Sequence, residues 1–240
     1  RFMREKFSQD KLDRCISCGY CLPACPTYKL TGNEESSPRG RITLMRAVQN
    51  DKLPALDLLK ESSFCLGCRA CEPVCPAGVE YGVLLEEMRD ITWQGKNRPL
   101  IIRGLFAIVD SKLGMWGLGL FSPMAKRRQA NKDLHLMYGC FERRLFPSVS
   151  RAVAKLAPEV SCSSDQGCCG ALHAHNGELE KGKEMAKALG EKLPGTILTT
   201  AGGCAAHLGS VIGSDRVQEF SQWWVKREIE LKPIEKAGRK

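Results

Sequence analysis

The feature that most constrains this chain is a run of four cysteines that occurs twice with the same spacing. In each copy two residues separate the first three cysteines, three residues precede the fourth, and a proline follows directly. The first copy reads CISCGYCLPACP and the second reads CLGCRACEPVCP. The eight cysteines are Cys15, Cys18, Cys21, Cys25, Cys65, Cys68, Cys71 and Cys75. Any fold of this chain must therefore place four thiols at fixed spacing in two separate loops.

Three kinds of chemistry use cysteines at this density: disulfides, structural zinc and iron–sulfur clusters. A secreted disulfide scaffold is usually shorter and has an even number of cysteines, whereas this chain has 240 residues and 13 cysteines. Structural zinc usually takes two separated C-x2-C pairs and requires neither a third thiol nor the proline. C-x2-C-x2-C-x3-C-P is instead the run with which bacterial proteins bind [4Fe-4S] clusters. We favour two such clusters, with zinc and disulfides as the alternatives.

The fourth cysteine of each run is expected to bind the cluster of the other run. Pro26 and Pro76 have a fixed φ and no backbone N–H, so they turn the chain away as the fourth ligand is placed. Two clusters bound in this way lie close together and leave no iron open to a substrate, as in an electron relay. The expected ligands are Cys15, Cys18, Cys21 and Cys75 for cluster 1, and Cys65, Cys68, Cys71 and Cys25 for cluster 2.

Net charge argues against a nucleic-acid partner. The formal charge is +9, but each cube with four thiolates carries about −2, which brings the loaded protein to about +5. The basic residues are scattered, with local groups at residues 126–128 and 232–240, and they form no stripe interleaved with aromatic residues. A solvated face or an acidic partner protein explains them better.

Many thiols without a signal peptide lead us to expect a cytoplasmic protein. The most apolar stretch is Pro99–Phe121, and it contains Arg103, Asp110 and Lys112. Central charges cost about 2.5–3.5 kcal/mol each on membrane insertion, so a spanning helix is rejected. A core or interdomain element is favoured, and a helix that lies on the inner face of the membrane or on a partner is the alternative.

Apolar periodicity predicts helices in the first half of the chain, from Pro38 and from Pro54 between the runs and after Pro76 to near Gly95. The second half predicts a β-α-β-α-β pattern. Its expected strands are DLHLMYGC (133–140), EVSC (159–162) and TILTTAGGC (196–204), with helices from Pro147 and over Glu178–Lys192. Ligands collect beyond the carboxyl ends of parallel strands, so four further thiols should meet there. They are Cys140, Cys168, Cys169 and Cys204.

The remaining candidates are weaker. Cys162 has no motif around it and is expected to be a small buried apolar residue. His173 and His175 follow the Cys168-Cys169-Gly170 loop and could hydrogen-bond to cluster sulfurs or move protons, or could be surface residues. His207, three residues after Cys204, is a weak candidate ligand. The pair Trp223-Trp224 is expected to serve packing or a partner contact.

These motifs together resemble one family. The two runs, the intervening SPRGRITLMRAV and the later QGCCGALHAH and AGGCAAH are similar to the iron–sulfur subunits of bacterial glycolate oxidase, over about residues 10–210. More broadly they resemble the lactate-utilisation and heterodisulfide-reductase-related proteins. The resemblance implies an α plus α/β chain: an α-helical two-cluster ferredoxin domain (1–98), a linker with an apolar helix (99–132), one cysteine-rich CCG domain (133–215), and a C-terminal helix with a basic tail (216–240).

The resemblance also implies a function and partners. In this family the subunit receives electrons from an FAD-containing dehydrogenase subunit that oxidises glycolate or D-lactate, and passes them toward the respiratory chain, at the membrane surface or to a quinone-linked acceptor. Substrate chemistry is expected on that flavoprotein. The four later thiols match the motif that holds a further iron–sulfur centre in heterodisulfide reductase. They make a candidate third centre, although His207 stands where a fifth thiolate often occurs and only one CCG domain is present.

Two other functions remain open. One is a heterodisulfide-reductase-like enzyme that uses the Cys168-Cys169 site for disulfide chemistry. The other is the iron–sulfur subunit of an anaerobic glycerol-3-phosphate dehydrogenase.

Overall fold

The computed structural model describes residues 6–111, 131–163 and 166–227. The end of the apolar stretch, the basic group at 126–128 and the basic tail from residue 228 lie outside these residues. The chain divides into two compact units. We call Arg1–Gly114 with Leu172–Lys183 the N-terminal unit, and Met115–Ala171 with Glu184–Lys240 the C-terminal unit.

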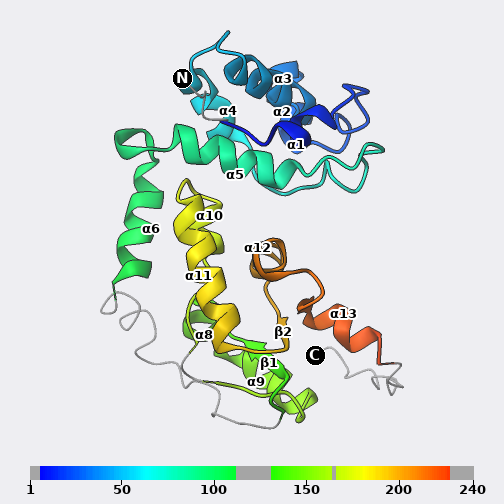
Figure 1. Ribbon diagram of the computed structural model, residues 1–240, viewed down its shortest axis with the longest axis vertical. Helices are drawn as coiled ribbons and strands as arrows, with labels where there is room; N and C mark the ends of the chain where they lie inside the picture. Colours follow the sequence, from blue (N-terminus) through cyan, green and yellow to red (C-terminus); the bar gives the residue numbers. More distant parts are fainter. Residues whose placement is uncertain (1–5, 112–130, 164–165, 228–240) are drawn as a thin grey trace, which may run out of the picture. The chain divides into compact units, whose positions relative to one another are not determined.

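The first part of the N-terminal unit is helical, as the sequence predicts (Figure 1). Its elements are α1 (Gln9–Asp13), α2 (Pro26–Thr31), η1 (Glu34–Ser36), α3 (Pro38–Gln49), η2 (Ala55–Leu58), α4 (Leu59–Phe64), α5 (Tyr81–Thr92), η3 (Gly95–Asn97) and α6 (Leu100–Asp110). Proline occupies the first position of α2 and α3, where a missing N–H costs nothing. The Ser37 hydroxyl accepts a hydrogen bond from the Gly40 N–H at 2.9 Å and caps α3.

The core of this unit lies between α1, α3, η2 and α5. Ile42, Met45 and Val48 recur at three-residue steps on α3 and are all buried. Leu84 and Met88, four residues apart on α5, are also fully buried in the same cluster. Burial of side chains of this size contributes about 1.5–3 kcal/mol each. Several of the motif cysteines pack on this core, so the helices hold the two cysteine loops in place.

The C-terminal unit contains a small parallel sheet in the order β1-β2-β3. Its elements are β1 (Leu134–Met137), α8 (Glu142–Leu145), α9 (Pro147–Leu156), β2 (Thr196–Thr199), α12 (Gly202–Ile212), β3 (Val217–Glu219) and α13 (Phe220–Val225). Two helices contain residues that belong to both units. They are α10 (Ala171–Ala174) and α11 (Leu179–Lys192). In the register, Leu136 lies opposite Leu198, and Ile197 lies opposite Val217.

Alternating residues of the strands build two apolar clusters. Met137 and Ile197 pack with Leu189 and Leu208 in one cluster. Leu136 and Leu198 pack in the other cluster, with residues of α9 and with the partly buried aromatic residues of α13. These aromatic residues are Phe220, Trp223 and Trp224. The tryptophan pair is thus a packing element, as expected.

One predicted strand is wrong. EVSC (159–162) forms no strand: Ser161 and Cys162 are isolated bridge residues, and Ser161 pairs with His135 of β1. Its N–H donates to the Leu134 carbonyl and its carbonyl accepts from the Leu136 N–H, at 2.9 and 2.8 Å. The third strand is β3, which the sequence analysis did not predict because three residues are too few to show a period of two.

Candidate iron–sulfur sites

The fourth cysteine of the first run lies with the first three cysteines of the second run. Cys25 is the N-cap residue of α2, and it lines one pocket together with Cys65, Cys68 and Cys71. The structure thus brings together the four residues that we expect to bind cluster 2. Pro26 and Thr27, the first two residues of α2, line the same pocket.

Three of the other four thiols pack against the core of the same unit. Cys15, Cys21 and Cys75 are partly buried and pack against the apolar cluster of α3 and α5, whereas Cys18 is exposed. Cys15 and Cys18 are close enough to Cys21 for their charges to act on its thiol. These are the residues that we expect to bind cluster 1.

The two cysteine loops have the same backbone conformation. Ser17 and Gly19 in the first loop have positive φ values of 57° and 87°. Gly67 and Arg69, at the same positions in the second loop, have φ values of 66° and 56°. This left-handed region favours glycine, and each loop has a glycine at one of the two positions. The repeated spacing therefore encodes a repeated loop, which turns its thiols toward a common centre.

Burial keeps two of these thiols protonated in the chain without clusters. Burial raises the pKa of Cys71 to about 12, with the nearby Glu72 carboxylate adding to the effect. Burial also raises the pKa of Cys21. A thiolate at either position needs a positive centre beside it, which a bound metal cluster supplies.

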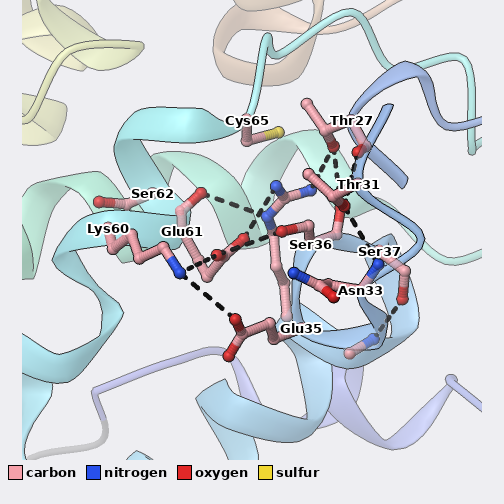
Figure 2. A network of polar contacts seen from close by, with 12 residues as sticks. Thr27, Thr31, Asn33, Glu35, Ser36, Ser37, Lys60, Glu61, Ser62 and Cys65 are labelled. Carbon is pink, nitrogen blue, oxygen red and sulfur yellow. Dashed lines mark hydrogen bonds and ion pairs between the residues drawn. The ribbon is translucent and has the colours of Figure 1, made fainter. Parts of the chain in front are cut away.

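A polar network surrounds the cluster 2 thiols, and sequence reasoning missed it. Figure 2 shows Thr27, Ser36 and Glu61 gathered beside Cys65. The Thr27 hydroxyl lies 3.1 Å from the Cys25 sulfur, and the Tyr81 hydroxyl donates to the Cys65 sulfur at 3.7 Å. Burial raises the pKa of the Tyr81 phenol well above its ordinary value, so the phenol stays a neutral donor.

Arg41 is the centre of this network and is only 1% exposed. Its guanidinium forms an ion pair with the buried Glu61 carboxylate at 3.1 Å. It also donates from Nε to the Glu61 carbonyl and from Nη1 to the Thr27 hydroxyl, both at 3.2 Å. An arginine inside a helical pattern is usually exposed, so its place in SPRGRITLMRAV gave no signal of this role.

The four later thiols also come together, in the C-terminal unit. Cys140 follows β1 and Cys204 lies in the first turn of α12 after β2, so both stand at carboxyl ends of parallel strands. The sulfurs of Cys169 and Cys204 are 3.0 Å apart. Hydrogen bonding to the Cys168 side chain, followed by burial, raises the pKa of Cys140, and hydrogen bonding to Cys168 and to Cys204 raises the pKa of Cys169.

The CCG loop presents backbone donors to its own sulfurs. Gly170 has a φ of 81°, a conformation that glycine adopts without strain. The N–H of Gly170 points to the Cys168 sulfur at 3.5 Å, and the N–H of Ala171 points to the Cys169 sulfur at 3.4 Å. Such donors stabilise sulfur ligands that carry negative charge. The arrangement suits a thiolate-bound centre.

The weaker candidates lie elsewhere. Cys162 is buried in the apolar cluster that contains Leu136, as a small apolar residue would be. His173 and His175 belong to the N-terminal unit, where their Nδ1 atoms lie 2.7 Å from the carboxylates of Glu178 and Glu86. Phe106 stacks on His173, with ring centroids 4.5 Å apart. His207 is buried on α12.

The donor sets fit clusters better than single ions. Within residues 6–111, 131–163 and 166–227, no three histidine, cysteine or acidic side chains lie close enough to hold one metal ion. A cube would take cysteine sulfur as its ligands, and each run supplies four thiols, three of them buried or half-buried.

Comparison with known proteins identifies the same two regions. The family model of the 4Fe-4S dicluster domain matches residues 11–79, and that of the cysteine-rich domain matches residues 134–209. These matches confirm that a domain of the dicluster family precedes a domain of the cysteine-rich family. No solved structure matches the chain significantly.

Three curated relatives match most of the chain. The probable glycolate oxidase iron–sulfur subunit of Bacillus subtilis is 34% identical over 85% of this chain and 60% of its own length. The glycolate oxidase iron–sulfur subunit of Escherichia coli is 33% identical over 82% of this chain and 58% of its own length. A heterodisulfide reductase subunit of Methanosarcina acetivorans is 24% identical over 81% of this chain and 56% of its own length.

The chain thus spans somewhat more than half the length of these relatives. The order of the two domains and these identities show that the chain, over most of its length, is a homologue of the glycolate oxidase iron–sulfur subunits, with a dicluster domain followed by a cysteine-rich domain.

Proposed function

We propose that this chain is the electron-transfer subunit of an FAD-dependent complex that oxidises a 2-hydroxy acid, glycolate or D-lactate. Two [4Fe-4S] clusters relay the electrons away from the flavin. The observation that carries the proposal is the position of Cys25 in one pocket with Cys65, Cys68 and Cys71, because shared motifs place two clusters close together. The names of the two bacterial relatives support the substrate class.

The chain's own residues have three tasks in this proposal. The thiols hold the clusters: Cys15, Cys18, Cys21 and Cys75 on one side, and Cys65, Cys68, Cys71 and Cys25 on the other. The apolar core of α3 and α5 keeps water from the inner sulfurs. Tyr81 donates a hydrogen bond to the Cys65 sulfur, and the Thr27 hydroxyl lies 3.1 Å from the Cys25 sulfur. When bound, the clusters supply one-electron chemistry, which matches a two-electron flavin donor to one-electron acceptors.

The acceptor in this proposal is quinone-linked and lies at the inner face of the membrane. Among the described residues no helix is long and apolar enough to cross a bilayer. α6 supports a peripheral contact, because Leu100 and Ile101 are 79% and 78% exposed on a strongly apolar helix. Sedimentation with anionic vesicles tests this contact. We expect Ile101→Asp to release the protein, whereas Leu30→Asp, at an equally exposed position of α2, should leave binding unchanged.

A second candidate function uses the cysteine-rich site. The 3.0 Å contact between the sulfurs of Cys169 and Cys204 favours thiol or disulfide chemistry at a third centre, as in a heterodisulfide reductase. Reduction of a disulfide substrate with an artificial electron donor, lost in Cys169→Ser, supports this candidate. Its absence leaves the site as a relay centre or a structural site.

Anaerobic iron and acid-labile sulfide analysis with EPR of the reduced chain is the first test. About eight irons with the coupled signals of two neighbouring cubes support the relay, and about twelve indicate a third centre at the cysteine-rich site. Zinc in place of iron and sulfide overturns the proposal. Oxidation of glycolate or lactate by the isolated chain overturns the assignment of substrate chemistry to the partner. A pull-down that recovers a glycerol-3-phosphate dehydrogenase flavoprotein changes the substrate class.

A further inference from the structure

The two halves of the dicluster domain share two matched segments, the cysteine run and the 12-residue helix after it, joined by connections of different length. α3 follows the first cysteine run and α5 follows the second, and each helix has 12 residues. The loops share their left-handed positions, and each run ends in Cys-Pro before the next segment. The correspondence allows the surroundings of the two clusters to be compared position by position. Where two matched positions have different side chains, the two clusters have different surroundings.

Three polar groups face the cluster 2 thiols. Thr27, two residues after Cys25, brings its hydroxyl to 3.1 Å from the Cys25 sulfur. Tyr81 begins α5, and its hydroxyl donates to the Cys65 sulfur at 3.7 Å. Arg41, the fourth residue of α3, is buried and lines the same pocket as these thiols.

The matched positions around cluster 1 are apolar. Ala77 stands two residues after Cys75, where Thr27 stands in the first run. Leu84 is the fourth residue of α5 and matches Arg41, and Pro38 begins α3 and matches Tyr81. Ala77 and Leu84 belong to the apolar cluster on which the inner cluster 1 thiols pack. Among the described residues, no side-chain hydroxyl hydrogen-bonds to the sulfurs of this set, which are those of Cys15, Cys18, Cys21 and Cys75.

Formal charge does not distinguish the two sites. Arg39 forms an ion pair with Glu34 beside the first loop. Arg69 forms an ion pair with Glu72 in the second loop, with 2.8 Å between nitrogen and oxygen. Arg41 is offset by Glu61. The difference between the side chains at the two sites therefore rests on the two hydroxyls and on how Arg41 orients one of them.

Arg41 fixes the orientation of the Thr27 hydroxyl. Its Nη1 donates to the Thr27 oxygen at 3.2 Å, so that oxygen is an acceptor for the guanidinium. The hydroxyl proton is then directed away from Arg41, toward the Cys25 sulfur or the Ser36 carbonyl, which lies at 2.8 Å. A thiolate at Cys25 has no proton of its own, so it competes for this proton as an acceptor.

We propose that the cluster held by Cys65, Cys68, Cys71 and Cys25 has the higher reduction potential of the two, so that a single electron in the domain resides on it. Reduction adds negative charge to the cluster and its sulfurs, and hydrogen bonds to sulfur stabilise that charge. The cluster held by Cys15, Cys18, Cys21 and Cys75 has no such donors from side chains and is the lower-potential centre. This inference rests on the proposed two-cluster function.

Redox titration of the loaded protein, followed by EPR, tests the inference. Tyr81→Phe and Thr27→Val each remove one hydroxyl and keep the shape of the site. We expect each variant to lower the higher of the two reduction potentials. The shift should correspond to at most a tenfold change in the ratio of reduced to oxidised cluster, which equals about 59 mV for one electron. Ala77→Thr places a hydroxyl at the matched position and should raise the lower potential.

Two controls separate tuning from damage. Tyr20→Phe removes an exposed hydroxyl from the first loop and should move neither potential. Iron content and the midpoint of thermal unfolding show whether each variant keeps both clusters. The inference is overturned if Tyr81→Phe and Thr27→Val keep about eight irons and shift only the lower potential or neither potential. This outcome leaves the proposed function standing. A wild-type chain without iron and sulfide overturns the proposed function as well.

Discussion

Arg46 and Arg89 make the same contact at the two cysteine loops. Arg46 stands eight residues after the start of α3 and Arg89 eight residues after the start of α5. The Nη2 atom of Arg46 donates to the carbonyl of Cys15, and that of Arg89 to the carbonyl of Cys65, both at 2.7 Å. Each helix therefore anchors the first cysteine of the run that precedes it by a charge-assisted hydrogen bond.

The two arginines differ in how many other carbonyls they hold. Arg46 also donates to the Leu12 carbonyl at 2.6 Å. Arg89 also donates to Ser62 and to His175, at 3.2 and 3.0 Å. Because each hydrogen bond from a charged donor contributes about 1.5–3 kcal/mol, we expect Arg89→Leu to destabilise the fold more than Arg46→Leu.

Iron per chain and the midpoint of thermal unfolding measure this difference. Each variant should lose iron from its own loop, with Arg89→Leu the less stable of the two. Arg89→Lys is the matched control for charge, and it should recover little, because an ammonium lacks the planar fork that reaches several carbonyls. A full complement of iron in Arg89→Leu would falsify the anchoring role.

The buried pair of Arg41 and Glu61 makes a second prediction. Both side chains are almost completely inaccessible, so Glu61→Gln leaves a buried guanidinium without its counter-charge. We expect that variant to lose about 3–5 kcal/mol of unfolding free energy, whereas the double variant Arg41→Met with Glu61→Leu should lose much less.

Lys60→Ala is the surface control for this pair. Lys60 is 76% exposed and lies 3.3 Å from Glu35 and 4.0 Å from Glu61, so these solvent-exposed contacts should contribute little and we expect a change within about 1 kcal/mol. Denaturant unfolding under anaerobic conditions measures all three variants. Equal losses in Glu61→Gln and Lys60→Ala contradict the prediction.

The sequence predicted those elements whose pattern is local. The periodicity of Ile42, Met45 and Val48 indicated α3, and the matched cysteine spacing indicated two equal loops. The meeting of Cys140 with Cys168, Cys169 and Cys204 followed from the topology of parallel strands, because strand ends meet at one edge of a sheet.

The rest depends on contacts between distant residues, which no local pattern records. Arg41 pairs with Glu61 across 20 positions, and although Arg41 shares the face of Met45 and Val48, the pattern gives no sign of this partner. Residues 172–183 belong to the N-terminal unit through contacts such as Arg98 with Glu178 at 2.7 Å, 80 positions apart. Such partners become visible only when the tertiary structure is known.

Two glycines inside helices should respond to alanine in opposite ways. In α3 a Cβ atom at Gly40 would lie 1.9 Å from the Glu34 carbonyl oxygen, so α3 and η1 would have to separate. In α6 a Cβ atom at Gly104 would meet nothing within 4 Å. We expect Gly40→Ala to destabilise by about 1–3 kcal/mol or more and Gly104→Ala to stabilise by up to about 1 kcal/mol. Thermal unfolding of both variants measures these changes in stability. A Gly40→Ala variant that is more stable than the wild type contradicts the predicted clash with the Glu34 carbonyl.

Iron retention should fall as the pH falls. Burial holds the pKa of Cys71 at about 12 in the cluster-free chain and raises that of Cys21, so both thiols are protonated at neutral pH. Each thiol that binds iron has released its proton. Below the pKa of the free thiol, binding therefore weakens by up to about tenfold per pH unit for each proton released.

Competition with an iron chelator between about pH 8 and about pH 6 measures this dependence. We expect more iron to be lost at each lower pH, with the loss steeper than a single proton would give, because several thiols are released together. Cys162→Ser should leave the profile unchanged, because Cys162 is buried among apolar side chains of the C-terminal unit and belongs to neither cysteine run. If iron retention does not depend on pH, the cysteine thiols do not regain protons when the iron is released. That result contradicts the prediction.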